Sequence, residues 1–267
     1  MKEERYQDRW RSLEPDRLER YKALFEYRPA ADPLIAPADI GDGHVVVDLG
    51  CGPGSLSVEL AKRVGPRGHV HAIDVNADFV QLARERVSRE RLGDRVTVHL
   101  EDKETLPLAS GSVDRLLAKN VLVYVEDPAG AYREFRRVLK PGGIAHAVDS
   151  DWDLAVAEPV PPELWKALLR AVRPAFRHPN IGRALFGYAR AAGFGEVKVQ
   201  VLARADTEGR LLPVVKGLCE HARTLGTMGS VDIERVERIV EQARGAGALL
   251  ILNPQFMVTA KSPQADR

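Results

Sequence analysis

The sequence has little cysteine, no excess of either charge and no long apolar run, and each shortage excludes a class of protein. Its 267 residues include two cysteines, too few for the disulfide framework of a small secreted domain. The 39 basic and 38 acidic residues give a net charge of +1, whereas nucleic-acid binders usually carry a basic excess. No apolar stretch reaches membrane-spanning length, and the first residues are charged, unlike a signal peptide. These features predict a cytoplasmic protein without nucleic-acid or membrane partners, and they leave the oligomeric state open.

What the sequence does contain is an apolar strand that leads directly into a glycine-rich turn and a helix. The stretch 45–60 reads VVVDLGCGPGSLSVEL, and its β-branched start is typical of a strand buried on both faces. Gly50, Gly52 and Gly54 make a tight turn, and apolar residues then recur at helical spacing. Such a turn places free backbone N–H groups and the positive end of a helix beside a bare loop. The stretch therefore predicts a nucleotide-sized ligand site.

The spacing around this turn indicates which nucleotide is bound. A dinucleotide fingerprint would need glycine at position 55, but Ser55 stands there, which disfavours an NAD-dependent dehydrogenase. A second short strand over 69–73 ends in Asp74, twenty positions after Gly54. An acid at this place can accept hydrogen bonds from both hydroxyls of a ribose. A third strand over 95–100 is followed by Glu101 and Asp102, so a nucleoside site is expected across these strand ends.

Together with the stretch LPLASGSVDRLLAKNVLVYVEDPAGAYREFRRVLKPGG at 106–143, these motifs resemble class I S-adenosylmethionine (AdoMet)-dependent methyltransferases of the small-molecule type. The resemblance implies AdoMet as cofactor and no metal, because the sulfonium methyl group is already electrophilic. It implies that an acid at the place of Asp102 meets the adenine amino group. Asp48 could simply hold the loop, and Cys51 is expected as a small filler rather than a nucleophile. The implied cofactor-binding residues are Asp48, Gly50, Cys51, Gly52, Gly54, Asp74, Val75, Asp102, Lys103 and Asn120.

The expected architecture is α/β: a Rossmann-like, seven-stranded, mostly parallel sheet with helices on both faces and a helical lid. Residues 44–150 are expected to form the AdoMet-binding core of one domain that covers 1–267. Further strands are expected over 196–203 and 248–260. Residues 1–40 are rich in aromatic residues and predict a helical flap, although these side chains could instead only pack on the sheet edge. Insertions over 154–178 and 206–247 are expected to form the lid.

Residues that could contact an acceptor lie on these peripheral segments. If 1–40 is a flap, Tyr21, Tyr27 or Arg28 would line the site. Trp152 is a candidate wall for a flat or apolar acceptor. His178 and His221 could titrate near neutral pH, although a lone histidine is more often a hydrogen-bonded surface residue. The candidate substrate-contacting residues are Tyr27, Trp152, His178 and His221.

Two residues are candidates for catalysis, Tyr124 and Asp151. Many relatives place histidines after the fourth strand, but here Leu122 is followed by Val123 and Tyr124, so the tyrosine hydroxyl is a candidate for positioning the acceptor. Asp151 belongs to an acidic cluster after the fifth strand and could act as a general base. Related methyltransferases often carry an Ile-Gly-Arg sequence where Arg183 stands, so an ion pair between Asp151 and Arg183 is the favoured interpretation.

The predicted function is transfer of the AdoMet methyl group to an O, N or C atom of a small molecule by in-line displacement. The sequence after the fourth strand lacks the Pro-Pro motif of DNA amino-methylating enzymes and the cysteine of cytosine C5 enzymes. Both absences favour a small-molecule acceptor. The alternative is a protein of the same fold that binds AdoMet or a nucleoside without transferring a methyl group.

Overall fold

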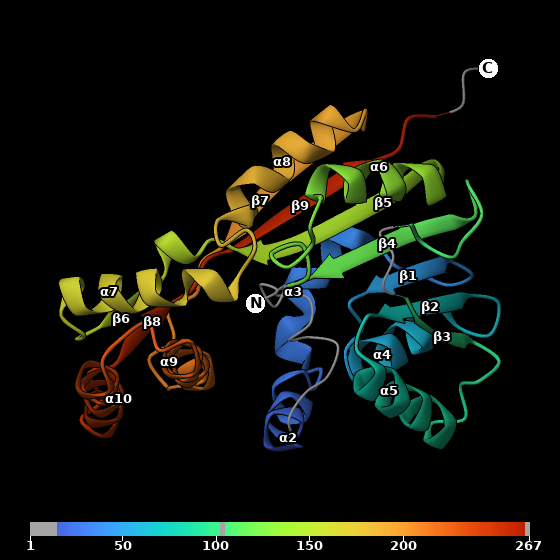
Figure 1. Ribbon diagram of the computed structural model, residues 1–267. Helices are drawn as coiled ribbons and strands as arrows, with labels where there is room; N and C mark the ends of the chain where they lie inside the picture. The colour runs from blue at the N-terminus through green and yellow to red at the C-terminus, as the bar shows by residue number, and fades with distance from the viewer. Residues whose placement is uncertain (1–14, 102–104, 265–267) are drawn as a thin grey trace, which may run out of the picture.

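The computed structural model describes residues 15–101 and 105–264, and its centre is a seven-stranded sheet in the order β3-β2-β1-β4-β5-β9-β7 (Figure 1). Strands β1 to β5 are parallel, β9 is antiparallel to β5, and β7 is antiparallel to β9. The expected seven-stranded, mostly parallel sheet is therefore confirmed. The strands are β1 (Val45–Leu49), β2 (His69–Asp74), β3 (Val96–Leu100), β4 (Val113–Lys119), β5 (Leu139–Ser150), β7 (Glu196–Leu202) and β9 (Gln255–Lys261).

Helices cover both faces of this sheet, as the fold class requires. Helices α4 (Ser55–Val64) and α5 (Ala77–Arg89) pack against β1, β2 and β3. Helices α6 (Pro128–Val138) and α8 (Ile181–Ala191) lie on the opposite face, against β5, β9 and β7 (Figure 1). The central strands read as apolar runs because both of their faces are buried: Val46 and Val47 are 0% exposed.

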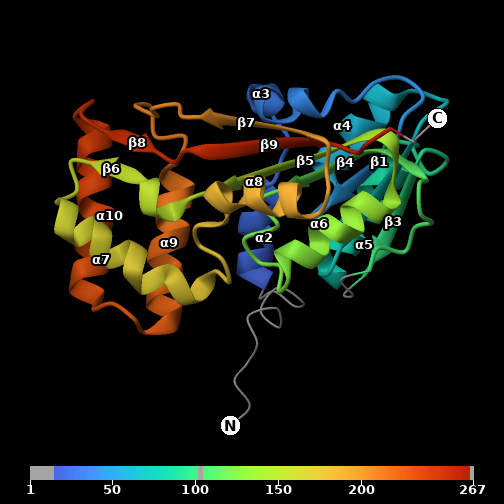
Figure 2. The same ribbon diagram turned by 90° about the horizontal axis from the view of Figure 1, so that it is seen from above.

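A second group of elements gathers at one end of the sheet, away from α4 and α5 (Figure 2). It contains α7 (Pro162–Val172), α9 (Leu212–Leu225), α10 (Ser230–Gly245) and a two-stranded sheet of β6 (Val156–Glu158) and β8 (Leu250–Leu252). Helices α7, α9 and α10 pack against one another. A short 3-10 helix, η3 (Trp152–Leu154), joins β5 to this group, and η4 (Arg173–Ala175) follows α7.

The last strand expected over 248–260 is two strands in the structure. Asn253 and Pro254 separate β8 from β9, and proline has no N–H with which to continue a ladder. Strand β8 instead pairs with β6, with Val156 opposite Leu252. This small sheet could not be predicted from the sequence, because three-residue strands carry too little pattern to be recognised.

The N-terminal segment is helical and is tied to the core. It consists of α2 (Pro15–Leu24), η1 (Pro29–Ala31), α3 (Asp32–Ile35) and η2 (Ala36–Ala38). Ile35 is 2% exposed and packs in the same apolar cluster as Val46 and Leu117. No helix of the described residues is long and apolar enough to cross a bilayer.

Candidate functional site

One cavity of about 530 Å³ opens at the carboxyl ends of the central parallel strands, where α/β sheets usually bind ligands. It extends from the glycine loop after β1 to α9. Eight of the sequence-predicted site residues line it: Gly50, Gly52, Asp74, Val75, Asn120, Tyr124, Trp152 and His221. Asp102 and Lys103 lie outside the described residues.

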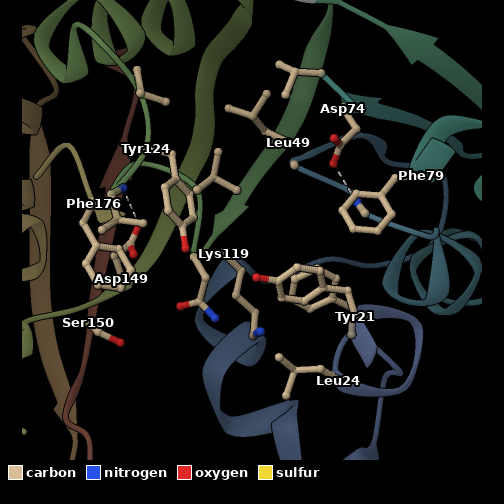
Figure 3. Close-up of a pocket in the computed structure, with 18 of the residues that line it drawn as sticks. Tyr21, Leu24, Leu49, Asp74, Phe79, Lys119, Tyr124, Asp149, Ser150 and Phe176 are labelled. Carbon is tan, nitrogen blue, oxygen red and sulfur yellow. Dashed lines mark hydrogen bonds between the residues drawn. The ribbon is translucent and has the colours of Figure 1, made fainter. Parts of the chain in front are cut away.

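Asp74 ends β2 with its carboxylate held at the cavity wall (Figure 3). The Gly52 N–H donates to its Oδ2 at 2.8 Å, and the Asn76 N–H donates to its Oδ1 at 2.9 Å. Burial raises the pKa of Asp74, while these backbone hydrogen bonds lower it. Each carboxylate oxygen has two lone pairs, so both can still accept from a ribose hydroxyl.

The glycine loop needs its glycines because other segments come very close to it. A Cβ atom on Gly50 would stand 2.2 Å from Cγ2 of Val121, and Gly50 has a φ of +70°. A Cβ atom on Gly54 would meet the backbone of Ala83 in α5 at 2.9 Å. The loop is therefore bare backbone that faces the cavity, and with Asp74 it fits an adenosine carrying an amino-acid tail.

Asp48 and Cys51 support this loop from inside the protein. Asp48 is 2% exposed and accepts a hydrogen bond from the Ser57 hydroxyl at 2.6 Å. Burial raises its pKa to about 6. Burial also raises the pKa of the Cys51 thiol, which suits a small filler. Neither side chain lines the cavity, so both act on the shape of the loop.

The chain after α2 lies over the glycine loop. The ring of Phe25 would be 3.3 Å from a Cβ atom on Gly52, and it stacks on Tyr21 with centroids 5.1 Å apart. Ser55, which replaces the third dinucleotide glycine, accepts from the Tyr27 N–H at 2.8 Å. The cavity is lined here by four aromatic or apolar residues: Tyr21, Leu24, Phe25 and Phe79.

Tyr27 itself does not line the cavity. Its hydroxyl donates to Asp32 at 2.5 Å and accepts from Arg63 at 2.8 Å. These two partners hold the phenol ring against the α3 and α4 side of the segment. Of the two tyrosines expected to line the site, Tyr21 does so, together with Phe25, and Tyr27 does not.

Aromatic side chains form the far wall of the cavity. Trp152 and Tyr124 both stack on Phe176, with centroid distances of 5.0 and 6.0 Å. His221 of α9 meets Phe176 edge-on at 6.3 Å. Phe176 was not predicted, because nothing in its local sequence separates it from an ordinary core residue. His178, by contrast, does not line the cavity; its Nε2 lies 3.4 Å from the Glu126 carbonyl oxygen.

Asp149 and Asp151 are two residues apart but have different surroundings. Asp149 lines the cavity, is 2% exposed, and accepts from the Val123 N–H at 3.3 Å (Figure 3). Burial raises its pKa to about 7. Asp151 does not line the cavity. Arg183 donates to both of its oxygens, and Asn180 donates to Oδ1 at 2.8 Å. The favoured ion pair of Asp151 with Arg183 is therefore confirmed.

Neutral polar groups lie beside Asp149. Ser150 accepts from the Gln255 amide at 2.6 Å and from the Asn253 amide at 3.2 Å, and all three residues line the cavity. Lys119, at the end of β4, also lines it and was not predicted. A lysine directly after the apolar residues 116–118, at the carboxyl end of the strand, is the signal that could have identified it.

The glycine loop, the strand-end acid and the cavity across the carboxyl ends of the sheet define a class I AdoMet-dependent methyltransferase domain. Residues 40–185 match the model of a family described as "Methyltransferase domain". The chain belongs to this family, which confirms the resemblance seen in the sequence.

Relatives match different lengths of the chain. It is 39% identical over 206 residues to an uncharacterized 37.1 kDa protein of transposon TN4556 from Streptomyces fradiae, covering 76% of this chain and 59% of that protein. It is 39% identical over 105 residues to methyltransferase GfsG of Streptomyces halstedii, covering 39% of this chain and 37% of GfsG. A demethylmenaquinone methyltransferase of Listeria monocytogenes is 31% identical over 137 residues, which are 50% of this chain and 55% of that enzyme. The chain thus spans less than two thirds of each of these relatives.

Solved structures share the fold. A SAM-dependent methyltransferase from Aquifex aeolicus is 20% identical with a TM-score of 0.54, covering 94% of this chain and 99% of the other. The [4+2]-cyclase SpnF is also 20% identical, with a TM-score of 0.57, covering 88% of this chain and 80% of SpnF.

Proposed function

We propose that this protein transfers the methyl group of AdoMet to a small, largely apolar acceptor by in-line displacement. One observation carries this proposal: a single cavity joins the glycine loop and Asp74 to the aromatic wall of Trp152 and Phe176. When bound, AdoMet supplies an electrophilic methyl group on its sulfonium. The chain has to bring an acceptor atom to about 3–3.5 Å from that methyl group and to exclude water.

The cofactor end of the cavity contains the groups that a nucleoside requires. Asp74 is proposed to accept from the ribose hydroxyls, which is supported by its carboxylate at the cavity wall and by the bare backbone of the glycine loop beside it. We also assign contacts with the cofactor at this end to Val75, Asn120 and Gly52. The adenine is proposed to meet Asp102 and Lys103. Tyr21 and Phe25 cover the loop, so residues 1–40 are proposed to act as a flap.

The acceptor end of the cavity favours an uncharged ring system. Stacked aromatic rings supply apolar area with defined geometry, and Trp152, Tyr124 and His221 surround Phe176. Ser150, Asn253 and Gln255 offer neutral hydrogen-bonding groups for a carbonyl or hydroxyl. A cavity bounded in this way by α9 favours a small molecule over nucleic acid. The segments 154–178 and 206–247 are therefore proposed as the lid.

Asp149 is the proposed proton acceptor for an acceptor hydroxyl, with Tyr124 as a positioning residue. A base works best when its pKa lies near the working pH, and burial raises the pKa of Asp149 to about 7. Asp151 has both carboxylate oxygens engaged by Arg183 and Asn180, so its proposed role is structural. A cytoplasmic setting is proposed as well, because both cysteines are free and buried.

The experiment is incubation of the full chain with AdoMet and a panel of phenols, quinols and amines, followed by mass spectrometry. We expect a gain of about 14 Da on a phenol or quinol, the class suggested by the acceptor end of the cavity. Turnover of an acceptor without this gain, while AdoMet binds, would support the alternative of a non-methylating protein of this fold. SpnF, a cyclase by name, shows that the fold is not restricted to methyl transfer.

A further inference from the structure

Lys119 places an ammonium group inside the cavity. It is the last residue of β4, it is half-buried, and it lines the cavity. Figure 3 shows its side chain in the middle of the site, with Tyr124 and Asp149 on one side and Asp74 and Phe79 on the other. The end of the side chain points toward Tyr21 and Leu24 of α2.

Within residues 15–101 and 105–264, this ammonium group has neither a hydrogen bond nor an ion pair. Burial lowers the pKa of Lys119, and the more distant carboxylates of Asp48 and Asp149 raise it without compensating the loss of water. A half-buried cation with three unused donors is unfavourable unless an anion completes its surroundings. An anionic group from a ligand bound in the cavity would complete these surroundings.

The position of Lys119 in the sheet indicates which ligand group this is. Strands β2, β1 and β4 are neighbours, so Asp74, the glycine loop and Lys119 follow one another across the strand ends. Strands β2 and β4 are separated by two strand spacings, a distance of about 10 Å. A nucleoside whose ribose lies at Asp74 and whose tail crosses the glycine loop ends near Lys119. The α-carboxylate is the only acidic group of AdoMet at neutral pH, and it lies at the end of that tail.

We propose that Lys119 binds the α-carboxylate of AdoMet and so fixes the amino-acid end of the cofactor. This inference rests on the proposed function only in its choice of cofactor, and it holds for any acceptor. It assigns a selectivity to the site: a nucleoside that carries the carboxylate is preferred over one that lacks it.

The test is calorimetric titration of the full chain with AdoMet and with decarboxylated AdoMet, which differ only in the carboxylate. A charge-assisted hydrogen bond corresponds to roughly 10- to 100-fold in affinity, so the wild-type protein should prefer AdoMet by that factor. Lys119→Met should remove this preference by weakening AdoMet while leaving decarboxylated AdoMet unchanged. Lys119→Arg should restore part of it.

The matched control is Lys62→Met, because Lys62 is an exposed lysine of α4 paired with Glu90 outside the cavity. This variant should keep the wild-type preference. If Lys119→Met fails to fold, Lys119→Gln replaces it in the same titration. If Lys119→Met loses affinity equally for both ligands, or still prefers AdoMet as the wild type does, the carboxylate role is overturned. The assignment of AdoMet as the cofactor would still stand. Wild-type protein that binds neither ligand would overturn the cofactor assignment, and the Lys119 proposal with it.

Discussion

At the scale of single residues, Asp151 shows how a carboxylate next to a ligand cavity can serve the fold. Its side chain is fully buried, whereas the Arg183 side chain is 51% exposed. Burial raises the pKa of Asp151, but the hydrogen bonds from Arg183 and Asn180 outweigh burial and lower it. Because the folded-state pKa is depressed, the pair stabilises the protein at neutral pH. This contribution is lost as the pH falls through the acid range below about 4.

We predict that Asp151→Asn lowers the free energy of unfolding by about 2 kcal/mol at pH 7. The loss should be smaller than for a fully buried pair because water reaches Arg183. The double variant Asp151→Asn/Arg183→Met should lose less than the sum of the two single variants, since neither charge is then left alone. Denaturant unfolding of the four proteins measures this coupling. Unchanged stability of Asp151→Asn with a collapsed kcat would make Asp151 the catalytic residue instead.

The contribution of Asp149 to the stability of the fold should have the opposite pH dependence. Burial raises its folded-state pKa from 3.8 to about 7, so the folded protein binds more protons than the unfolded chain between these values. Stability from this group is therefore present at low pH and is lost as the pH rises from about 4 to 7.

We predict that Asp149→Asn gains stability relative to the wild type as the pH rises through this window. The change should be a few kcal/mol at most, at about 1.4 kcal/mol per pKa unit. Asp48 also has a raised pKa and is present in both proteins, so its contribution to the pH dependence cancels when the stability of the variant is compared with that of the wild type. Asp94→Asn, at a side chain 79% exposed, is the control and should follow the wild type at every pH. A difference between Asp149→Asn and wild type that does not vary with pH would contradict the raised pKa.

At the scale of elements, helix α9 lines the end of the cavity where the acceptor is proposed to bind, and it contains a glycine at which a larger side chain would fill that space. A Cβ atom on Gly217 would have no neighbour within 4 Å, and Gly217 lines the cavity. A larger side chain there can therefore enter open space without displacing the core.

We predict that Gly217→Phe abolishes methylation of the acceptor while the affinity for AdoMet stays within about threefold. Its thermal stability should be equal or higher, since glycine inside a helix is about 1 kcal/mol less favourable than alanine. Gly187→Phe is the matched control: Gly187 is also inside a helix and has open space around its Cβ position, but it does not line the cavity. Wild-type turnover in Gly217→Phe would show that the acceptor lies elsewhere.

The segment after α2 is a second element whose position depends on contacts distant in sequence. Glu26 accepts from both terminal nitrogens of Arg86 in α5, at 2.8 and 2.7 Å, and it also accepts from the Ser55 hydroxyl. These bonds place Phe25 against Gly52. The proposed flap is thus connected to the same helices, α4 and α5, that follow the glycine loop and Asp74.

At the scale of the whole molecule, cofactor binding should stabilise the entire domain, because the cavity is bounded by the sheet, α2 and α9 together. We predict that AdoMet at a hundredfold excess over its Kd raises the melting temperature by about 5–10 °C, from roughly 2.7 kcal/mol of binding free energy. NAD at the same concentration should not, because Ser55 and its Tyr27 contact replace the third dinucleotide glycine. Differential scanning fluorimetry measures both shifts. An equal shift with NAD would contradict the nucleoside assignment.

The order of the central elements could be predicted from the sequence because each signal is local. A β-branched run, a glycine turn and a helical repeat specify β1, the loop and α4 within about twenty residues, and Asp74 follows at a set spacing. Most of the cofactor end of the cavity therefore follows from sequence alone, including Gly50, Gly52 and Val75.

The acceptor end was decided by tertiary structure. Asp149 faces the cavity and Asp151 faces Arg183, because β5 ends at Ser150 and regular side-chain alternation ends with it. Phe176, Asn253 and Gln255 reach the cavity from segments distant in the chain. Lys119 ends β4 in the sequence, and only the packing of the neighbouring strands places its side chain in the cavity. Local spacing determined the glycine loop and the strand-end acid at which the nucleoside is proposed to bind, and long-range packing decided which side chains line the other end of the cavity.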